Sequence, residues 1–245
     1  MPTRLLLPIA LAQGLWVRQT VPRLPPAIGR RGAFGAGTDG ALSVVGVGDS
    51  IIAGVGVERQ ERALVGHFAR RLHGRLQRPV RWRACGLNGA DSTTIRERIA
   101  PVAPAADVYI VSAGVNDAVR GVSVAKFTAN LAGLAATLRR KSPHSALVFA
   151  GIPPLDRFPA LPWPLGAVLG ARAARLQAAA RAAAREMNTI CFDFPADLPP
   201  GGFASDGFHP AEDACDAWAG WLLEAWLSRT SRPAAFDCES ASPPA

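Results

Sequence analysis

Residues 42–50 are Leu-Ser-Val-Val-Gly-Val-Gly-Asp-Ser, a short Val-rich run that ends in a glycine and two polar residues. Apolar runs of this length are typical of parallel strands that are buried on both faces. Gly48 permits a tight turn directly after the strand, and Asp49 and Ser50 follow in that turn. The stretch therefore predicts the first strand of an α/β sheet, with polar side chains at its carboxyl end.

Four more apolar runs follow, and segments with helical periodicity separate them. The expected strands after the first are 80–85, 107–113, 146–151 and 189–194, and the expected helices are 61–77, 93–99, 124–140, 166–187 and 211–227. This alternation predicts a parallel sheet with helices on both faces. Ligands of such sheets bind outside the carboxyl ends of the strands.

Four polar stretches fall on that edge of the expected sheet. They are Gly48–Ser50 after the first strand, Asn88-Gly89 after the second, Gly114–Asp117 after the third, and Asp206–Pro210 between the fifth strand and the last helix. Each alone is weak evidence, because such short motifs are common in turns and helix caps. Together they supply a nucleophile, an oxyanion hole, and a base with its orienting carboxylate.

Ser50 is the expected nucleophile, and His209 is the base that would remove its proton. Asp206 lies three residues before His209, in a loop broken by Gly207, and its carboxylate is placed to orient the imidazole. A metal half-site is the alternative, but no second histidine or acidic cluster accompanies the pair. The other histidines are His67, His73 and His144, in segments away from the active edge.

The oxyanion hole needs several hydrogen-bond donors around one point. We expect the side-chain amide of Asn116, the backbone N–H of Gly89 and the backbone N–H of Ser50 to provide them. Asp49 and Asp117 are interpreted as structural, the first as a turn carboxylate and the second as a loop or cap residue. Nucleotide-binding loops are excluded by the glycine spacing, and there is no Gly-x-Ser-x-Gly elbow.

The composition indicates one folded α/β domain. The chain has 245 residues, 49% of them apolar, and a net charge of +8 that comes almost wholly from arginine. A basic surface attracts nucleic acid or anionic lipid, but no zinc spacing or aromatic-basic stripe is present, so we expect no nucleic-acid partner and no metal. Four widely spaced cysteines favour buried thiols and leave one disulfide open.

The two ends of the chain differ from the centre. We expect residues 1–40 to be an apolar segment with a Pro/Gly/Arg-rich lead-in, residues 41–229 to be the domain, and residues 230–245 to be a disordered tail. Leu5–Trp16 is too short for a membrane span and for most secretory leaders. An interfacial anchor or a helix packed on the domain is expected instead, and cytoplasmic, periplasmic and membrane-peripheral locations all stay open.

These motifs, over roughly residues 42–228, resemble the SGNH, or GDSL, hydrolase family. Gly48-Asp49-Ser50-Ile51 replaces the usual Gly-Asp-Ser-Leu, Gly-Val-Asn-Asp carries Asn116, and Asp-Gly-Phe-His-Pro carries Asp206 and His209. The resemblance implies a flavodoxin-like, three-layer, doubly wound, five-stranded parallel sheet of order 2-1-3-4-5, with no cofactor. By the same resemblance Ser50 is the nucleophile, and Gly89 and Asn116 belong to the second and third blocks.

The expected activity is hydrolysis of acyl or lysophospholipid-type esters through an acyl-enzyme, by a monomer. Residues 153–170 follow the fourth strand and carry an apolar set suited to an acyl chain, namely Leu155, Phe158, Leu161, Trp163 and Leu165. The arginines of residues 171–187 and the apolar N-terminus predict peripheral contact with an anionic membrane. A carbohydrate O-acetyl esterase and an inert binding module on the same scaffold are the alternatives.

Overall fold

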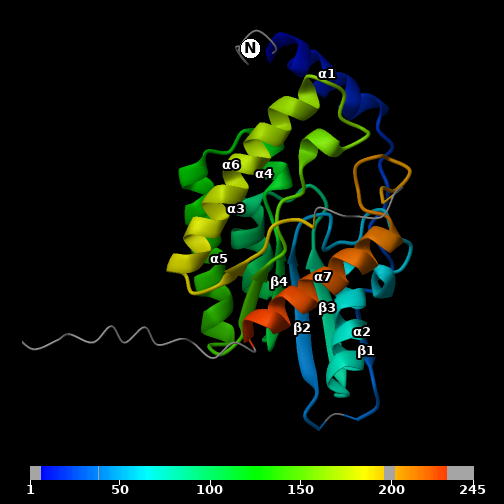
Figure 1. The fold of residues 1–245 in the computed structure, drawn as a ribbon, viewed down its shortest axis with the longest axis vertical. Helices are drawn as coiled ribbons and strands as arrows, with labels where there is room; N and C mark the ends of the chain where they lie inside the picture. The colour runs from blue at the N-terminus through cyan, green and yellow to red at the C-terminus, as the bar shows by residue number, and fades with distance from the viewer. Residues whose placement is uncertain (1–6, 38, 196–201, 231–245) are drawn as a thin grey trace, which may run out of the picture.

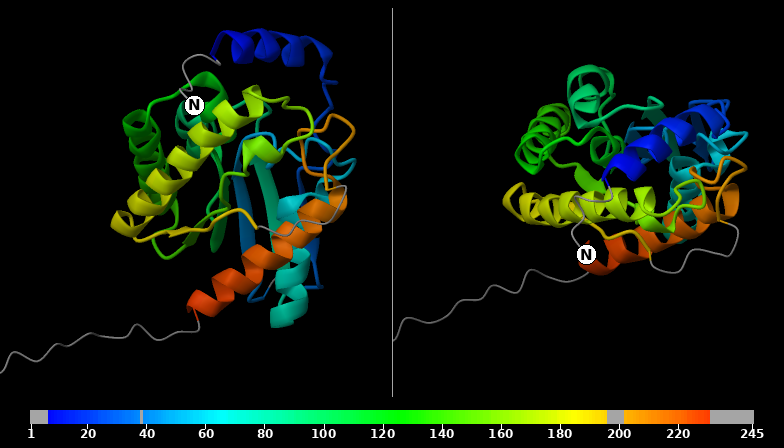
Figure 2. Two further views of the ribbon diagram at one scale, coloured as in Figure 1. Left: turned by 45° about the horizontal axis from the view of Figure 1, so that its top comes forward. Right: turned by 90° about the horizontal axis from the view of Figure 1, so that it is seen from above.

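The computed structural model describes residues 7–37, 39–195 and 202–230, and they form three layers around one sheet (Figures 1 and 2). The strand order is β1-β3-β2-β4-β5-β6, and all neighbours are parallel except β1 and β3. The strands are β1 (Arg31–Phe34), β2 (Leu42–Gly48), β3 (Val80–Gly86), β4 (Val108–Ser112), β5 (Ala146–Phe149) and β6 (Ile190–Cys191).

The five expected strands are present as β2 to β6, and their order confirms the predicted 2-1-3-4-5 arrangement. The sheet has a sixth strand, β1, that was not expected, because its residues fell within the expected Pro/Gly/Arg-rich lead-in. Gly32 of β1 lies directly over the indole of Trp82, where an added Cβ would be 2.7 Å from the ring. The edge strand therefore depends on a glycine that allows this close approach.

Helices cover both faces of the sheet (Figure 2). The longer ones are α1 (Leu7–Thr20), α2 (Leu64–Leu76), α5 (Val124–Lys141), α6 (Leu165–Glu186) and α7 (Glu212–Thr230). The shorter ones are α3 (Ser92–Thr94), α4 (Val115–Arg120), the π-helical turn η3 (Ile95–Ile99), and the 3-10 turns η2 (Gln60–Arg62), η4 (Ala100–Val102) and η5 (Leu155–Arg157). The expected helix from residue 61 is therefore divided, because η2 ends at Arg62, Ala63 is extended, and α2 begins at Leu64.

Successive strand residues point into two separate cores. Val45, Tyr109 and Leu147 pack on the side of α5 and α6, whereas Val44 and Val108 pack on the side of α2 and α7. This is the two-sided burial that a parallel sheet requires. It leaves the carboxyl ends of the strands as the open edge, where the expected site residues lie.

The ends of the chain are described only in part. α1 packs against α6, which agrees with one of the two expectations for the apolar N-terminal segment. The predicted tail lies outside the described residues except for Thr230, and the boundary at residue 41 stays a prediction. Cys85, Cys191 and Cys215 are free thiols, and Cys238 lies outside the described residues. Among the described helices, none combines the length and hydropathy of a membrane span.

Candidate active site

Ser50 stands in a tight turn at the carboxyl end of β2. Gly48 is required there, because an added Cβ would lie 2.3 Å from the carbonyl oxygen of Ser112 on the neighbouring strand. The carboxylate of Asp49 accepts hydrogen bonds from the backbone N–H of Ile51, at 3.1 Å, and from the hydroxyl of Ser112, at 2.9 Å. Asp49 therefore ties the turn to β4, as the interpretation of a turn carboxylate predicted, while the Ser50 side chain faces the pocket described below.

Asp49 is almost completely buried, at 1% exposure. Burial raises the pKa of its carboxyl to about 7, although the hydrogen bonds from Ser112 and Ile51 oppose this change. The nearby Asp117 raises the pKa further. The residue directly before Ser50 is therefore an unusually weak acid.

His209 and Asp206 form a close pair in the loop before α7. His209 Nδ1 lies 2.6 Å from Asp206 Oδ2, and the side chains are only 14% and 1% exposed. Because the ionised carboxylate can only accept, Nδ1 carries the proton and Nε2 keeps its lone pair. The imidazole is therefore in the tautomer that can take a proton from a serine hydroxyl.

Backbone hydrogen bonds hold this loop in shape. Asp206 Oδ1 accepts from the backbone N–H groups of Phe208 and His209, both at 2.9 Å, and Gly207, directly after Asp206, has a φ of 61°. Burial acts to raise the pKa of Asp206, but the hydrogen bonds from His209 and Phe208 outweigh it, so the pKa lies below its usual value. Asp206 is therefore ionised at neutral pH.

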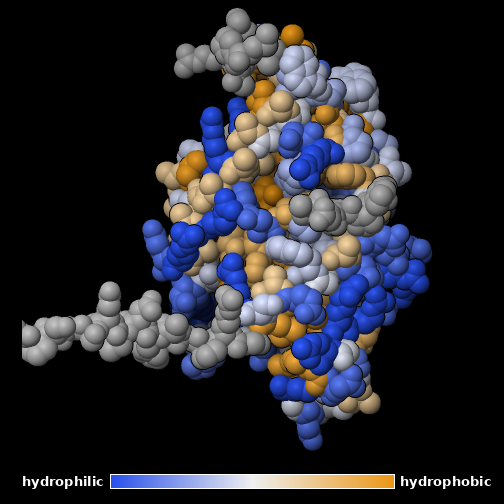
Figure 3. Space-filling model, in the orientation of Figure 1, coloured by the Kyte–Doolittle hydropathy of each residue, from blue (hydrophilic) through white to orange (hydrophobic). Residues whose placement is uncertain are grey.

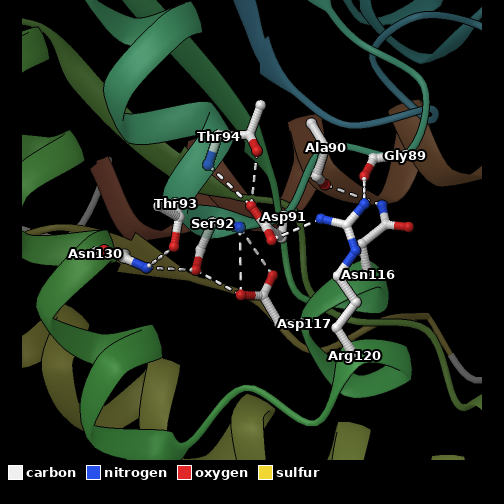
Figure 4. Close-up of polar contacts among 10 residues, drawn as sticks. All are labelled: Gly89, Ala90, Asp91, Ser92, Thr93, Thr94, Asn116, Asp117, Arg120 and Asn130. Carbon is white, nitrogen blue, oxygen red and sulfur yellow. Dashed lines mark hydrogen bonds and ion pairs between the residues drawn. The ribbon is translucent and has the colours of Figure 1, made fainter.

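The loop after β3 brings Gly89 beside Asn116 of α4 (Figure 4). Gly89 has a φ of 76°, a conformation that favours glycine. Asn116 Nδ2 donates to the carbonyl oxygen of Ala90 at 2.9 Å, which leaves its second amide hydrogen for another acceptor. Within the described part of the chain, the backbone N–H groups of Ser50 and Gly89 donate to no other protein atom.

Arg120 clamps the Gly89 loop from the end of α4 (Figure 4). Its guanidinium donates to the carbonyl oxygen of Gly89 at 2.8 Å and to the carboxylate of Asp91 at 2.6 Å. Asp91 also caps α3 by accepting from the backbone N–H of Thr94. Burial acts to raise the pKa of Asp91, but the bonds from Thr94 and Arg120 lower it below its usual value.

Asp117 fastens α4 to the start of α3 from the buried side. Its carboxylate accepts from both the backbone N–H and the hydroxyl of Ser92, and Asn130 of α5 donates to the same hydroxyl at 2.9 Å. The carboxylate is fully buried and does not reach the pocket. This agrees with the interpretation of Asp117 as a structural residue. Ser92 takes part in this hydrogen-bond network, and Asp91 is the residue that caps α3.

Ser50 and His209 line one pocket whose other walls are almost wholly apolar. The free volume of the pocket is only about 20 Å³. The pocket is narrow because aromatic rings crowd it. The other lining residues are Ile51, Val115, Pro153, Phe158, Phe194, Gly202, Phe203, Phe208, Pro210 and Trp218.

The apolar set expected from residues 153–170 is mostly wrong. Phe158 lines the pocket and packs edge-to-face on Phe203 and Phe208, with both pairs of ring centroids 5.1 Å apart. Trp163 is exposed, and the three leucines of the set, Leu155, Leu161 and Leu165, are buried in the core. Hydrophobicity alone does not show that these three leucines pack in the core and do not face the pocket.

Several residues of the site were not foreseen. Phe208 lies within the Asp-Gly-Phe-His motif and Phe203 lies three residues before it, and these positions were the available signal for them. Arg120 lies four residues after Asn116 and therefore on the same face of α4, which was a second signal. Ser112 and Trp218 carry no local signal, since their roles depend on contacts across the sheet.

A sequence model of the GDSL-like lipase/acylhydrolase family matches residues 47–217, which is more than half of the chain. The chain belongs to this family. This GDSL hydrolase therefore acts on ester bonds, and the match includes Ser50, Gly89, Asn116, Asp206 and His209. A comparison with curated proteins gave no significant match.

Solved structures similar to this GDSL hydrolase share its fold at low identity. A structure of TesA is 22% identical with a TM-score of 0.58, covering 77% of this chain and 98% of TesA. A carbohydrate acetylesterase family member from Sinorhizobium meliloti is 17% identical with a TM-score of 0.59, covering 76% and 98%. The psychrotrophic esterase EstA from Pseudoalteromonas sp., solved in a form inhibited by monoethylphosphonate, is 18% identical with a TM-score of 0.58 and the same coverage.

Proposed function

We propose that this GDSL hydrolase is a serine esterase that cleaves carboxylic acyl esters through an acyl-enzyme. One observation carries the proposal: His209, oriented by Asp206 at 2.6 Å, lines the same apolar pocket as Ser50. An apolar pocket with a few polar groups at one end suits an acyl group whose carbonyl carbon lies beside the serine.

In the first step the Ser50 Oγ attacks the ester carbonyl while His209 Nε2 takes its proton. The carbonyl oxygen becomes an oxyanion, which the N–H groups of Ser50 and Gly89 and the amide of Asn116 stabilise. The C–O bond to the alcohol then breaks, and His209 returns its proton to the leaving oxygen. Asp206 stays ionised and supports the charged imidazole.

In the second step His209 takes a proton from water, and the resulting hydroxide attacks the acyl-enzyme. The same donors stabilise the second oxyanion. The bond between Ser50 Oγ and the acyl carbon breaks, the serine recovers its proton from His209, and the acid leaves. No bound metal or cofactor enters either step.

The test is labelling by a fluorophosphonate probe, followed by turnover of nitrophenyl esters of increasing chain length. A phosphonate inhibits the similar EstA, so we expect Ser50 to react with a phosphonate probe as well. Wild type should be labelled, Ser50→Ala should not, and the exposed Ser228→Ala should behave as wild type. Absence of labelling and turnover in folded wild type would contradict the proposal and favour the binding module.

The narrow pocket favours a second candidate, an O-acetyl esterase acting on carbohydrate. The small free space favours a short acyl group such as acetyl, whereas a long acyl chain requires Phe158, Phe203 or Phe208 to move. A structural neighbour is named as a carbohydrate acetylesterase family member. A sharp fall in kcat/KM beyond acetyl esters would select this candidate, and a rise with chain length would select acyl esters.

A further inference from the structure

α1 presents its large apolar side chains outward, the reverse of the usual pattern for a helix packed on a domain. Its inward stripe consists of Ala10, Gln13, Gly14 and Val17, of which Ala10 alone is buried. The outward side chains include Leu11 at 70% exposure and Trp16 at 57%. The other exposed members are Leu7, Ile9 and Leu15.

Two hydrogen bonds fasten α1 to the loop that borders the active-site pocket. Gln13 Nε2 donates to the carbonyl oxygen of Trp163 at 2.8 Å, and Gln13 Oε1 accepts from the backbone N–H of Leu165 at 3.0 Å. Trp163 itself is 69% exposed, and the same loop contributes Pro153 and Phe158 to the pocket. The exposed apolar surface therefore lies on the same end of the molecule as the site (Figures 1 and 2).

The charge around α1 is of one sign. Residues 7–37 contain four arginines and no acidic residue. Arg18 and Arg23 line an open hollow beside Leu15, and no carboxylate lines it. Among the described residues, neither arginine belongs to an ion pair. Orange and pale residues gather around α1 at the top of Figure 3.

We propose that this surface, the α1 platform, docks on an anionic lipid bilayer. The platform comprises the outward side chains of α1 together with Trp163, Arg18 and Arg23. Aliphatic and tryptophan side chains partition into the boundary between head groups and acyl chains, and the arginines contact lipid phosphates. The helix lies flat on the bilayer and does not span it.

The arginines Arg175 and Arg185 of α6 do not belong to the platform. α6 runs away from α1 down the side of the molecule (Figure 1), and at about 1.5 Å per residue they lie roughly 15 Å and 30 Å along the helix from Leu165. Both distances exceed the Debye length of roughly 8–10 Å at physiological salt. The earlier expectation that the α6 face assists membrane contact is therefore replaced by the α1 platform.

Docking would bring lipid-borne esters to the edge that carries Ser50, and this role in substrate supply rests on the proposed function. Binding itself does not depend on catalysis. Turnover of a water-soluble acetyl ester, measured in the same samples, separates the two: lost binding with intact turnover overturns docking alone, and intact binding without turnover overturns the esterase alone.

The experiment is co-flotation of the full chain with vesicles of phosphatidylcholine alone or with one third phosphatidylglycerol. The first variant combines Leu11→Ser and Trp16→Ser, and its control is Val102→Ser, a residue 74% exposed in η4, beside the end of α5. The second variant combines Arg18→Gln and Arg23→Gln. Its control, with the same net charge, combines Arg175→Gln and Arg185→Gln on α6.

Wild type should float with the anionic vesicles, and binding to phosphatidylcholine alone should be weaker. Each platform variant should lower the apparent affinity on the order of tenfold, and both controls should bind like wild type. Failure of wild type to bind anionic vesicles, or equal binding by platform variants, overturns the proposal. Sedimentation of the wild type tests whether the platform instead binds a second copy of the chain. A wild-type dimer that dissociates in the variant Leu11→Ser with Trp16→Ser also overturns the proposal.

Discussion

Asp206 uses both carboxylate oxygens, one for the imidazole of His209 and the other for two backbone N–H groups of its own loop. The backbone bonds fix the carboxylate, and the carboxylate in turn fixes the ring. The orientation of His209 therefore does not depend on a single flexible contact.

Asp206→Asn should keep the loop folded, because the amide oxygen can still accept from the backbone. It should lower kcat roughly 10³–10⁴-fold with little change in KM, because the amide N–H₂ no longer accepts from Nδ1 and the wrong tautomer is favoured. Steady-state kinetics on a soluble ester measures this. Asp213→Asn, an exposed carboxylate at the start of α7, is the control, and equal activity of both variants would contradict the assigned role.

Asp49 should make the protein less stable as pH rises. The folded state keeps the Asp49 proton up to about pH 7, whereas the unfolded chain releases it near 3.8. Between these values the folded state binds more protons, so the free energy of unfolding falls with rising pH, by on the order of a few kcal/mol in total. Above about pH 7 both states are ionised, and Asp49 causes no further change.

Asp49→Asn should remove this decline, because the amide oxygen still accepts from Ile51 and Ser112 but does not ionise. Urea denaturation across the window should show the variant gaining stability relative to wild type as pH rises, with a plateau above about pH 7. Asp213→Asn should show no such trend. If the difference in unfolding free energy between Asp49→Asn and wild type does not change with pH, the role assigned to Asp49 is wrong.

At the level of elements, α4 and the loop after β3 act as one unit, because α4 supplies Asn116, Asp117 and Arg120 to that loop. Arg120 is half-exposed, so its ion pair with Asp91 adds little to stability. Its contribution is the position of Gly89, whose N–H is the proposed oxyanion donor.

Arg120→Met should therefore lower kcat on the order of tenfold while the free energy of unfolding changes by less than about 1 kcal/mol. Arg120→Lys should restore part of kcat, because one donor can still reach Gly89 or Asp91. Kinetics and urea denaturation of the same preparations measure both effects. A variant that raises only KM, or that loses stability and activity together, would contradict a positioning role.

Prediction from the sequence succeeded where a local pattern determines the element. The Val-rich runs of β2 and β4 and the helical spacing of α5 give their type and nearly their ends. β1 escaped prediction because Arg-Gly-Ala-Phe lacks β-branched residues, and its pairing with Val80–Arg83 is a contact across the chain. β6 was expected over six residues but pairs over two, since its partner β5 ends at Phe149.

The same contrast holds for the site. Ser50 was expected after the first strand and His209 before the last helix, and the fold brings these two residues to one pocket at the carboxyl edge of the sheet. Their catalytic roles, and those of Gly89 and Asn116, stay predictions. The residues of the pocket walls were not predicted, because hydrophobicity does not distinguish Phe158, which lines the pocket, from Leu155, which packs in the core. Packing against α6 makes that distinction.

For the whole molecule, α1 is attached to the domain by few interactions, since it buries only Ala10 fully and Gln13 supplies its two side-chain bonds to the pocket loop. Removing residues 1–20 should therefore lower the thermal midpoint by roughly 2–8 °C, as expected for a loss of about 1–2 kcal/mol. Turnover of a soluble acetyl ester should stay within roughly threefold of wild type. Calorimetry and kinetics check both values, and an unfolded or inactive product would show that α1 is part of the core.

The two ends of the sheet have a consequence for the behaviour of the protein at high concentration. The central strands β2 and β3 each span seven residues, but the outer strands β1 and β6 span four and two. An unpaired sheet edge is a template on which another chain can add a strand, and short edges offer few backbone groups for it. Strand-by-strand aggregation is therefore disfavoured, even though the interior strands are among the most β-prone sequences of the chain.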